Sequence, residues 1–410
     1  MTQVKNQKVG IVGLGYVGLP LALHISSHGS NVVGFDINSR DIENLVEGKS
    51  RIPSVSNVQL VELLKSSFLS FTIDPRELEK CQIVIICVPT PLKGNGEIDL
   101  SFLESAADVL VDFVTAGTLI VSESTSYPGT LREVFQSRLQ EKRKGEKFYL
   151  ATAPERVDPG SQFSFRDIPR VVSGIDSVST AKAVEFYSQF FTRVIRVSSP
   201  EVAEMSKLLE NTFRQVNISL VNEFNDICRR SGINTREVID AAATKPYGFM
   251  KFNPSAGIGG HCIPVDPEYL QFFAKRSGST LRMVSAASSV NGDMGELIVK
   301  RVEGLLAGLR LTKVLLVGVA YKSNIPDVRD TPATAILEAF QSRGIQVDWY
   351  DPLVDNWRNE KSSNLIHDKW QVAIVVTAHD EIDINNIEKS CGKVFDCTGK
   401  YSNISSIVQI

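Results

Sequence analysis

The sequence has few cysteines and no long apolar run. Its six cysteines are scattered through 410 residues, without a CxxC pair and without the dense framework that small secreted domains need. Lys5 and Lys8 precede an apolar stretch that superficially resembles a signal peptide, but glycines interrupt it and no convincing cleavage site follows, so a buried strand and turn explain it better. No apolar run approaches the roughly 20 residues of a membrane-spanning helix. We therefore expect a protein of the reducing cytoplasm that does not associate with a membrane.

A large excess of charge of either sign is also absent. The formal net charge is -3, which provides no broad attraction for nucleic acid or an anionic membrane, although a local basic pocket can still hold a small anion. With 43% hydrophobic and 22% charged residues, the composition is that of a globular protein, and the length favours two or three domains. We expect no nucleic-acid partner.

Short β-branched runs alternate with helix-like stretches in the first half of the chain, which is the pattern of βαβ units around a parallel sheet. The strands expected there span residues 8–12, 31–36, 83–88, 118–122 and 149–152. Most are continuous apolar runs, as expected where helices cover both faces of a sheet. A second α/β block starts at Lys313 with KVLLVGVAY and continues through VDWYD, VAIVVT and VFDC. The sequence therefore predicts an α/β protein with two Rossmann-like, doubly wound parallel-sheet domains.

A long amphipathic helix is expected between the two blocks. The sequence SSPE at residues 198–201 marks its start, because a serine cap, an early proline and a glutamate suit a first helical turn. Apolar residues then recur every three or four positions, at Val202, Met205, Leu209, Phe213, Val216, Leu220, Phe224 and Ile227. This stripe is expected to pack either against a second copy, forming a homodimer core, or only against its own chain. The sequence leaves both open.

A glycine-rich motif, GLGYVG at residues 13–18, follows the first strand and precedes a helix. The first glycine permits a tight turn, the second lets the backbone approach a pyrophosphate, and the third lets the helix pack closely on the strand. The next strand ends in Asp36, whose carboxylate can accept hydrogen bonds from ribose hydroxyls and would repel a 2′-phosphate, so NAD is favoured over NADP. The alternative is a tight turn without ligand. The cofactor-binding candidates are Gly13, Gly15, Tyr16, Val17, Gly18 and Asp36.

Two further loops follow strands of the same predicted sheet, VPTP at residues 88–91 and ESTSYPGT at residues 123–130. Ligands of open α/β sheets bind at the carboxyl ends of the strands, so these loops are expected to line the nicotinamide end of the site. Ordinary turn chemistry explains the same residues equally well. The candidates here are Pro89, Thr90, Ser124 and Thr125.

Cys262 lies in the glycine-rich loop AGIGGHCIPVDP, residues 256–267. The glycines are expected to let a substrate approach the sulfur, while His261 and Asp266 are polar neighbours in a loop that prolines stiffen. A cysteine needs a lowered pKa to act as a nucleophile, and most cysteines are buried and inert. A zinc site is the rival interpretation, but two adjacent ligands and one acid fall short of the usual set and spacing.

The ordered motifs resemble the UDP-glucose/GDP-mannose dehydrogenase family over nearly the whole chain. The matching strings are GLGYVGLP, VPTP, ESTSYPGT, APERVDPG, EMSKLLENTFR, GIGGHCIPVDP and GVAYKSNIPDVRDTP. The resemblance implies an NAD-binding domain at residues 1–198, a central helical dimerisation segment with the cysteine loop at 199–305, and a UDP-sugar-binding domain at 306–410.

The resemblance also implies roles for individual residues. Cys262 matches the nucleophile, Asp266 a partner that helps activate water, and Glu155 a general acid/base. Lys207 and Asn211 match a helix pair that binds the sugar and stabilises oxyanions, and their four-residue spacing places both on one helix face, away from the apolar stripe. The remaining implied contacts are Arg156, Gly259, Tyr321 and Lys322 to the substrate and Arg329 to the cofactor.

The implied reaction is an NAD-dependent, four-electron oxidation of the C6 alcohol of a UDP-sugar to a carboxylate, through a thiohemiacetal and a thioester on Cys262. The strings PERVDPG, TKPYGFMKF and GGHCIPVDP are most similar to UDP-N-acetylglucosamine 6-dehydrogenases, with UDP-N-acetylmannosamine and UDP-glucose as alternatives. The resemblance further implies a role in supplying precursors of surface polysaccharides such as capsule or O-antigen.

One departure and two rival functions stand beside this interpretation. Relatives often carry an arginine just after the aspartate and threonine of their last strand, where this chain has DCTGK at residues 396–400. Lys400 is a candidate replacement, but it is a point charge without bidentate geometry. A two-electron β-hydroxyacid dehydrogenase would have no use for Cys262 or the last α/β block. A non-catalytic nucleotide-binding protein would not need the cysteine, lysine, asparagine, glutamate and aspartate that all stand at their motif positions.

Overall fold

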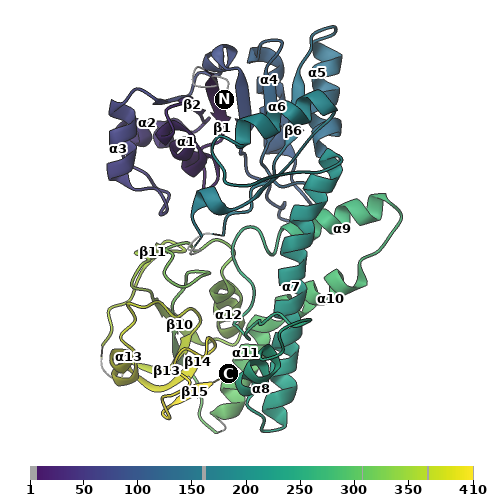
Figure 1. Ribbon diagram of the computed structural model, residues 1–410. Coiled ribbons are helices and arrows are strands. Elements are labelled where there is room, and N and C mark those ends of the chain that lie inside the picture. The colour runs from purple at the N-terminus through teal and green to yellow at the C-terminus, as the bar shows by residue number, and fades with distance from the viewer. Residues whose placement is uncertain (1–6, 159–162, 307, 367–368, 410) are drawn as a thin grey trace. The chain divides into compact units, whose positions relative to one another are not determined.

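The computed structural model describes residues 7–158, 163–306, 308–366 and 369–409. The chain divides into two compact units (Figure 1). The first contains residues 1–210 and 268–278, and the second contains residues 211–267 and 279–410. Helices α7 (Pro200–Arg230) and α9 (Asp266–Arg276) each contribute residues to both units.

The first unit is built around an eight-stranded sheet in the order β3-β2-β1-β4-β5-β6-β7-β8. Neighbouring strands are parallel except β6 and β7, which pair antiparallel. All five strands expected from the sequence are confirmed, whereas β3, β7 and β8 were not expected. The bounds are β1 (Lys8–Val12), β2 (Asn31–Phe35), β3 (Leu69–Thr72), β4 (Ile83–Ile86), β5 (Leu119–Ser122), β6 (Tyr149–Thr152), β7 (Arg170–Gly174) and β8 (Val194–Arg196).

Helices cover both faces of this sheet, which explains why its strands are apolar without alternation. Val9 and Ile11 of β1 pack into a core with residues of α1, α2, α3 and α6, whereas Val12 packs into a second core with residues of α4, η2 and α5. Successive side chains of a strand point to opposite faces, so both faces of β1 are buried. The helices are α1 (Gly18–Ser27), α2 (Ser39–Val46), α3 (Asn57–Lys65), η1 (Pro75–Lys80), α4 (Ser101–Phe113), η2 (Leu131–Gln136), α5 (Ser137–Lys142), η3 (Phe165–Asp167) and α6 (Ser177–Tyr187).

The second unit has a five-stranded sheet, all parallel, in the order β10-β9-β13-β14-β15. Its core again divides into two clusters, one containing residues of α11 and α12 and the other residues of α13. The strands are β9 (Lys313–Val317), β10 (Gln346–Tyr350), β13 (Trp370–Val375), β14 (Cys391–Asp396), β15 (Ile407–Gln409) and the small antiparallel pair β11 (Asn356–Trp357) and β12 (Glu360–Lys361). The helices are α8 (Thr235–Ala243), α10 (Arg282–Gly292), α11 (Met294–Leu305), α12 (Pro332–Gln341) and α13 (Ile384–Ser390). The predicted fold class, two doubly wound α/β sheets with a long central helix, is confirmed.

Helix α7 begins at Pro200, as the sequence predicts, but its burial is the reverse of an ordinary amphipathic helix. Six residues of the predicted apolar stripe are exposed: Val202, Leu209, Phe213, Leu220, Phe224 and Ile227. The polar face is buried instead, where Ser219 Oγ donates to Ala287 O and Asn222 Oδ1 accepts from Ser255 N. Within one chain these six positions are therefore left largely uncovered, although Phe213 contacts Phe252, and the choice between packing against a second copy and packing within the chain stays a prediction.

Among the described residues, no helix combines the length and the apolar character that crossing a bilayer requires.

Candidate functional site

The glycine motif of the first unit adopts the turn that its sequence predicts. Gly13 has φ +90°, and a Cβ there would lie 2.8 Å from the carbonyl oxygen of Cys87. A Cβ on Gly18 would lie 1.9 Å from Gly13 O, so only glycine lets α1 pack this closely on the end of β1. A Cβ on Gly15 would meet no atom within 4 Å, which leaves its backbone open toward a ligand. The three glycines thus do what a dinucleotide fingerprint requires.

Asp36 follows β2 and is held at the mouth of this turn. Its Oδ2 accepts from Leu14 N at 2.8 Å, and its Oδ1 accepts from Asn38 N at 3.0 Å. A carboxylate has about four acceptor positions, so these two bonds orient the group and leave capacity for ribose hydroxyls. The first unit therefore fits NAD at both the pyrophosphate and the ribose positions.

The loops after β4 and β5 are tied to each other. Ser124 Oγ donates to Val88 O at 2.8 Å, and Thr90 is buried. The Ser124 hydroxyl proton is thus already used within the protein, as the turn interpretation expects, although its oxygen can still accept. The second loop is also anchored to α7, because Glu204 accepts from Gly129 N at 2.7 Å and from Leu131 N at 3.1 Å. Burial raises the pKa of Glu204 to about 8.

Glu155 lies at the carboxyl edge of the same sheet, three residues after β6, and is 7% exposed. Its Oε1 accepts from the backbone N–H groups of Arg156 and Val157, both at 2.6 Å, and its Oε2 lies 2.5 Å from Arg170 Nη2. Burial alone would raise the pKa of Glu155, but Arg170 and the two N–H donors outweigh burial and lower it. The Arg156 guanidinium, expected at the substrate, pairs with Glu210 at 2.6 Å.

Lys207 and Asn211 are one helical turn apart on the buried face of α7, 7% and 5% exposed. Lys207 is therefore not the solvated lysine that its residue type would suggest. In the second unit, Asn211 Nδ2 donates to Asp266 Oδ2 at 2.5 Å. This bond fixes the carboxylate of Asp266 at the first residue of α9, next to the cysteine loop.

Cys262 is exposed, whereas the other five cysteines are buried. Burial raises the pKa of four of those thiols, and so disfavours their thiolates: Cys81, Cys87, Cys391 and Cys397. Cys262 O accepts from Asp266 N at 2.9 Å, so the cysteine sits on a tight turn that leads into α9. His261 Nδ1 lies 4.0 Å from Asp330, and burial, with Arg329, lowers the pKa of this histidine. Within the described ranges, no three His, Cys, Asp or Glu residues are placed to hold a metal ion.

The glycines before Cys262 have a packing role in the second unit. A Cβ on Gly260 would lie 2.7 Å from the ring of Tyr321, and a Cβ on Gly259 would lie 2.7 Å from Pro332. Gly260 N also donates to Arg329 O. These two glycines thus let the cysteine loop pack closely on residues 321–332 of the same unit, where an added side chain would clash.

The second unit repeats the turn of the first in its own sheet. Gly318 N donates to Tyr350 O at 2.8 Å, as Gly13 N does to Phe35 O at 2.9 Å. The acid that follows the second strand differs, however. Asp351 is 3% exposed, accepts from Val319 N and Ala320 N, and pairs with the buried His379 at 3.1 Å. Its carboxylate therefore has its bonding partners within the protein.

Cationic groups at the carboxyl edge of this second sheet differ in their partners. Lys400 Nζ lies 2.6 Å from Asp380 and donates to His379 O, and Arg329 forms a two-pronged pair with Asp327. Arg236, from α8, donates to Thr398 O, and its guanidinium lies within 2.0 Å of where a Cβ on Gly399 would be. Arg236 could not be found from the sequence, because its hydrogen-bond acceptor Thr398 is 162 positions away.

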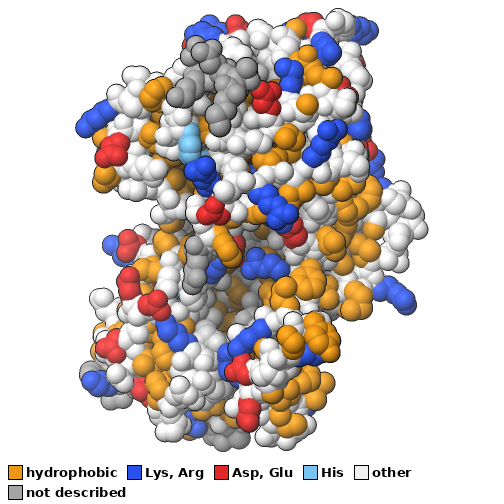
Figure 2. All heavy atoms as spheres, in the orientation of Figure 1, with side chains coloured by type: hydrophobic (Ala, Val, Ile, Leu, Met, Phe, Trp, Pro, Cys, Tyr) orange, Lys and Arg blue, Asp and Glu red, His pale blue; other side chains and the backbone are white. Residues whose placement is uncertain are grey.

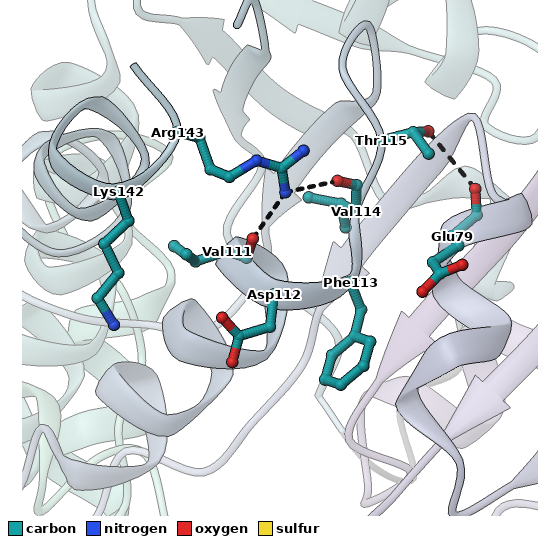
Figure 3. Close-up of a pocket in the computed structure, with 8 residues that line it drawn as sticks. All are labelled: Glu79, Val111, Asp112, Phe113, Val114, Thr115, Lys142 and Arg143. Atoms are coloured by element: carbon teal, nitrogen blue, oxygen red, sulfur yellow. Dashed lines mark hydrogen bonds between the residues drawn. The ribbon is translucent and has the colours of Figure 1, made fainter.

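A cavity of about 450 Å³ in the first unit lies at the amino end of the sheet (Figure 3), whereas the dinucleotide turn lies at the carboxyl end. It is lined by η1, the end of α4 and α5, near the amino ends of β4 and β5. Its Arg143 donates to the carbonyl oxygens of Val111 and Val114 and pairs with Glu146, so the guanidinium caps α4 (Figure 3). We assign it no role in the reaction.

The two α/β sheets, the dinucleotide turn of the first unit and the cysteine loop of the second unit together define an NAD-dependent nucleotide-sugar dehydrogenase. Three models of the UDP-glucose/GDP-mannose dehydrogenase family match the chain: the NAD binding domain at residues 7–191, the central domain at 201–293 and the UDP binding domain at 315–401. The chain belongs to this family.

Several relatives of this chain have names that include acetamido sugars. The chain is 37% identical to a UDP-N-acetyl-D-glucosamine 6-dehydrogenase of Pseudomonas aeruginosa, over 86% of this chain and 84% of the relative. It is 34% identical to protein CapL of Staphylococcus aureus, over 96% of each. A solved structure of a UDP-D-ManNAc dehydrogenase from Pyrococcus horikoshii matches with a TM-score of 0.88 at 30% identity, covering 98% of this chain and 99% of that one.

Proposed function

We propose that this dehydrogenase oxidises the C6 alcohol of UDP-N-acetylglucosamine to the carboxylate, with Cys262 as the covalent nucleophile. The observation that carries the covalent route is an exposed thiol on a turn whose next acid, Asp266, is fixed by Asn211. The choice of sugar rests on the similarity to the Pseudomonas aeruginosa 6-dehydrogenase and on the strings shared with that branch.

In the first oxidation, the C6 hydroxyl oxygen loses its proton to water as a hydride leaves C6, so negative charge develops on that oxygen. We assign the stabilisation of that charge to the ammonium of Lys207 and the amide of Asn211. The glycine turn and Asp36 would hold NAD, and two NAD molecules bound in succession would accept one hydride each in the two oxidations. Tyr16, Val17, Pro89, Thr90, Ser124, Thr125 and Arg329 complete the proposed cofactor set.

The aldehyde is then captured by the thiolate of Cys262, which forms a C–S bond and a thiohemiacetal. Loss of a second hydride leaves a thioester, and water attacks its carbonyl carbon with Glu155 and Asp266 as proton acceptors. The C–S bond breaks, the thiolate of Cys262 returns, and the product is a carboxylate. Covalent capture keeps the reactive aldehyde on the enzyme between the two oxidations. The remaining proposed substrate contacts are Arg156, Gly259, Tyr321 and Lys322.

The sugar is tested by initial rates of NADH formation on UDP-N-acetylglucosamine, UDP-N-acetylmannosamine, UDP-N-acetylgalactosamine and UDP-glucose. We expect the highest kcat/KM on UDP-N-acetylglucosamine. The Pyrococcus horikoshii structure makes UDP-N-acetylmannosamine the second candidate. A preference for UDP-glucose would contradict the assignment to the acetamido branch.

We also propose a homodimer whose core is the exposed stripe of α7. In the second unit, Leu220 and Ile227 of this helix are 58% and 62% exposed, and Tyr247 and Met250, which follow α8 in the sequence, are exposed as well. Apolar side chains gather along the edge formed by α7 and α8 (Figure 2). Contiguous exposed apolar surface of this kind is rare on monomers and typical of an interface between copies.

We also propose that the NAD-binding domain ends at residue 198 and that the UDP-sugar-binding domain begins at residue 306. The same proposal includes a cytoplasmic location and a role in supplying surface-polysaccharide precursors. They rest on the family resemblance.

A further inference from the structure

A cluster of charged residues is buried inside the first unit, next to Glu155. Arg170, the first residue of β7, is 1% exposed, and its Nη1 lies 3.2 Å from Glu123 Oε2 while its Nη2 lies 2.5 Å from Glu155 Oε2. Tyr187, on α6, donates its hydroxyl to Glu123 Oε1 at 2.6 Å. Glu123, directly after β5, is 1% exposed. Four elements of the fold therefore converge on one charge cluster, and only Glu155 has an assigned role.

The cluster holds one cation for two carboxyl groups. The faces of the Arg170 guanidinium are covered by the rings of Phe165 and Phe191, at 5.2 and 4.3 Å to the ring centroids. The other titratable groups that act on the cluster are Cys87 and His24. Burial raises the pKa of the Cys87 thiol and lowers the pKa of the His24 imidazole, so both are favoured in their neutral forms. A buried excess charge is costly, and the cluster is neutral only when its two carboxyls share one proton.

That proton belongs mainly to Glu123. Burial raises the pKa of Glu123 to about 7, partly offset by Arg170 and increased further by the negative charge of Glu155. Glu155 keeps a lowered pKa because it has Arg170 and two backbone N–H donors. Two interacting carboxyls titrate as a pair, with apparent pKa values that belong to both.

We propose that Glu123 and Glu155 form one acid–base unit, in which Glu123 holds the proton that Glu155 takes up and returns; this rests on the proposed function of Glu155. Glu123 is a positioning residue that acts through Glu155. Ionisation of Glu123 places a second negative charge beside Glu155 and so increases its proton affinity. During thioester hydrolysis, one proton of the attacking water passes to Glu155 and from there to Glu123, whose carboxyl lies against the same Arg170 guanidinium. The product acid releases the other proton, and the electrons of the C–S bond remain on the Cys262 thiolate.

Glu123→Gln is the first test, because it keeps the shape of the side chain but removes its titration. In the native enzyme we expect kcat to rise with pH through about 7 as the pair loses its shared proton. In Glu123→Gln we expect no such rise of kcat near pH 7. The value of kcat falls by about tenfold to a hundredfold, which is part of the rate enhancement that general-base catalysis provides. The KM values for NAD and the UDP-sugar stay within about twofold, because Glu123 acts only through Glu155. Glu146→Gln, which removes an exposed carboxyl paired with Arg143, is the matched control and keeps the native profile.

Tyr187→Phe is the second test and serves where Glu123→Gln does not fold. It removes the donor that favours ionised Glu123, so the rise of kcat moves to higher pH, by about half a unit to one unit. A native pH profile in Glu123→Gln, or an unmoved rise of kcat in Tyr187→Phe, overturns the proposal.

An infrared titration of the protonated carboxyl band separates this proposal from the proposed function. Because Glu204 also holds a proton near this pH, the titration is made in the Glu204→Gln background; there we expect a band that disappears near pH 7 and is missing when Glu123→Gln is added, even if no UDP-sugar is oxidised. Absence of that band from the Glu204→Gln protein overturns the shared proton, whereas NADH formation without Cys262 contradicts the covalent route alone.

Discussion

At the scale of single residues, two cationic side chains at the carboxyl edge of the second sheet, Lys400 and Arg236, are candidates for binding phosphate. Lys400 forms an ion pair with Asp380. Arg236 donates one hydrogen bond to Thr398 O and lies close to Gly399, so its other N–H groups remain for further contacts. A guanidinium binds phosphate with two parallel hydrogen bonds, which an ammonium does not. Since the matched UDP binding domain covers residues 315–401, the phosphates of UDP are expected near this edge.

We therefore predict that Arg236→Ala weakens UDP binding more than Lys400→Ala does. Loss of a charge-assisted contact costs about 1.5–3 kcal/mol, or roughly tenfold or more in Kd. Isothermal titration of each variant with UDP measures the difference, and circular dichroism checks that both fold. Restoration of binding by Gly399→Arg in the Arg236→Ala background is the strict form of the test. Equal losses in the two single variants would refute this assignment.

The sequence predicts single residues well where the requirement is local. The glycine spacing after the first strand predicts the turn at Gly13, and the end of the next strand predicts the acid at Asp36. The structure has both. The cluster of Glu123, Arg170 and Tyr187 could not be predicted, because a buried ion pair is a property of tertiary packing. Gly259 and Gly260 have a packing role that the sequence could not predict, because Tyr321 and Pro332, which contact them, are distant in sequence; their expected role in substrate access stays a prediction.

At the scale of elements, apolar content decided which strands could be recognised. Strands β1 and β6 have the predicted bounds because they are central and continuous apolar runs. Strand β3 is at one edge, with only Leu69 buried, and β8 at the other edge has no buried residue. Strand β7 begins with an arginine, a residue that composition assigns to the surface.

The contact between α7 and the loop after β5 predicts a pH-dependent stability. Burial raises the pKa of Glu204 to about 8, against about 4.3 in unfolded chains, so between these values the native protein binds a proton that the unfolded chain has released. The free energy of unfolding therefore falls as the pH rises from about 4.3 through 8. Glu204→Gln is expected to flatten this slope in urea unfolding between pH 5.5 and 8.5.

Glu201→Gln is the control for that experiment, because Glu201 stands one turn earlier on α7 and pairs with Arg132 at 2.7 Å near the surface. It should keep the native slope. Since the raised pKa of Glu123 contributes with the same sign, the slope in Glu204→Gln decreases but does not vanish. An identical slope in native protein and Glu204→Gln would show that burial of Glu204 does not control its protonation.

At the scale of the whole molecule, the reversed burial of α7 predicts assembly. A charge placed in the centre of an apolar interface loses its hydration without gaining a partner. We predict that Leu220→Asp dissociates the homodimer, so that light scattering after size-exclusion chromatography gives a mass near the 45.1 kDa of one chain. Lys389→Asp, at an exposed position of α13 and outside the α7 stripe, is the control. A dimer that survives Leu220→Asp unchanged would place the interface elsewhere.

The covalent four-electron route is tested most directly by counting NADH formed per molecule of UDP-N-acetylglucosamine consumed. The native enzyme should form two NADH for each sugar and a carboxylate product, because the thioester on Cys262 commits every aldehyde to the second oxidation. Cys262→Ser should not reach that ratio. One NADH for each sugar in the native enzyme, or full four-electron turnover by Cys262→Ser, would contradict the role of this thiol.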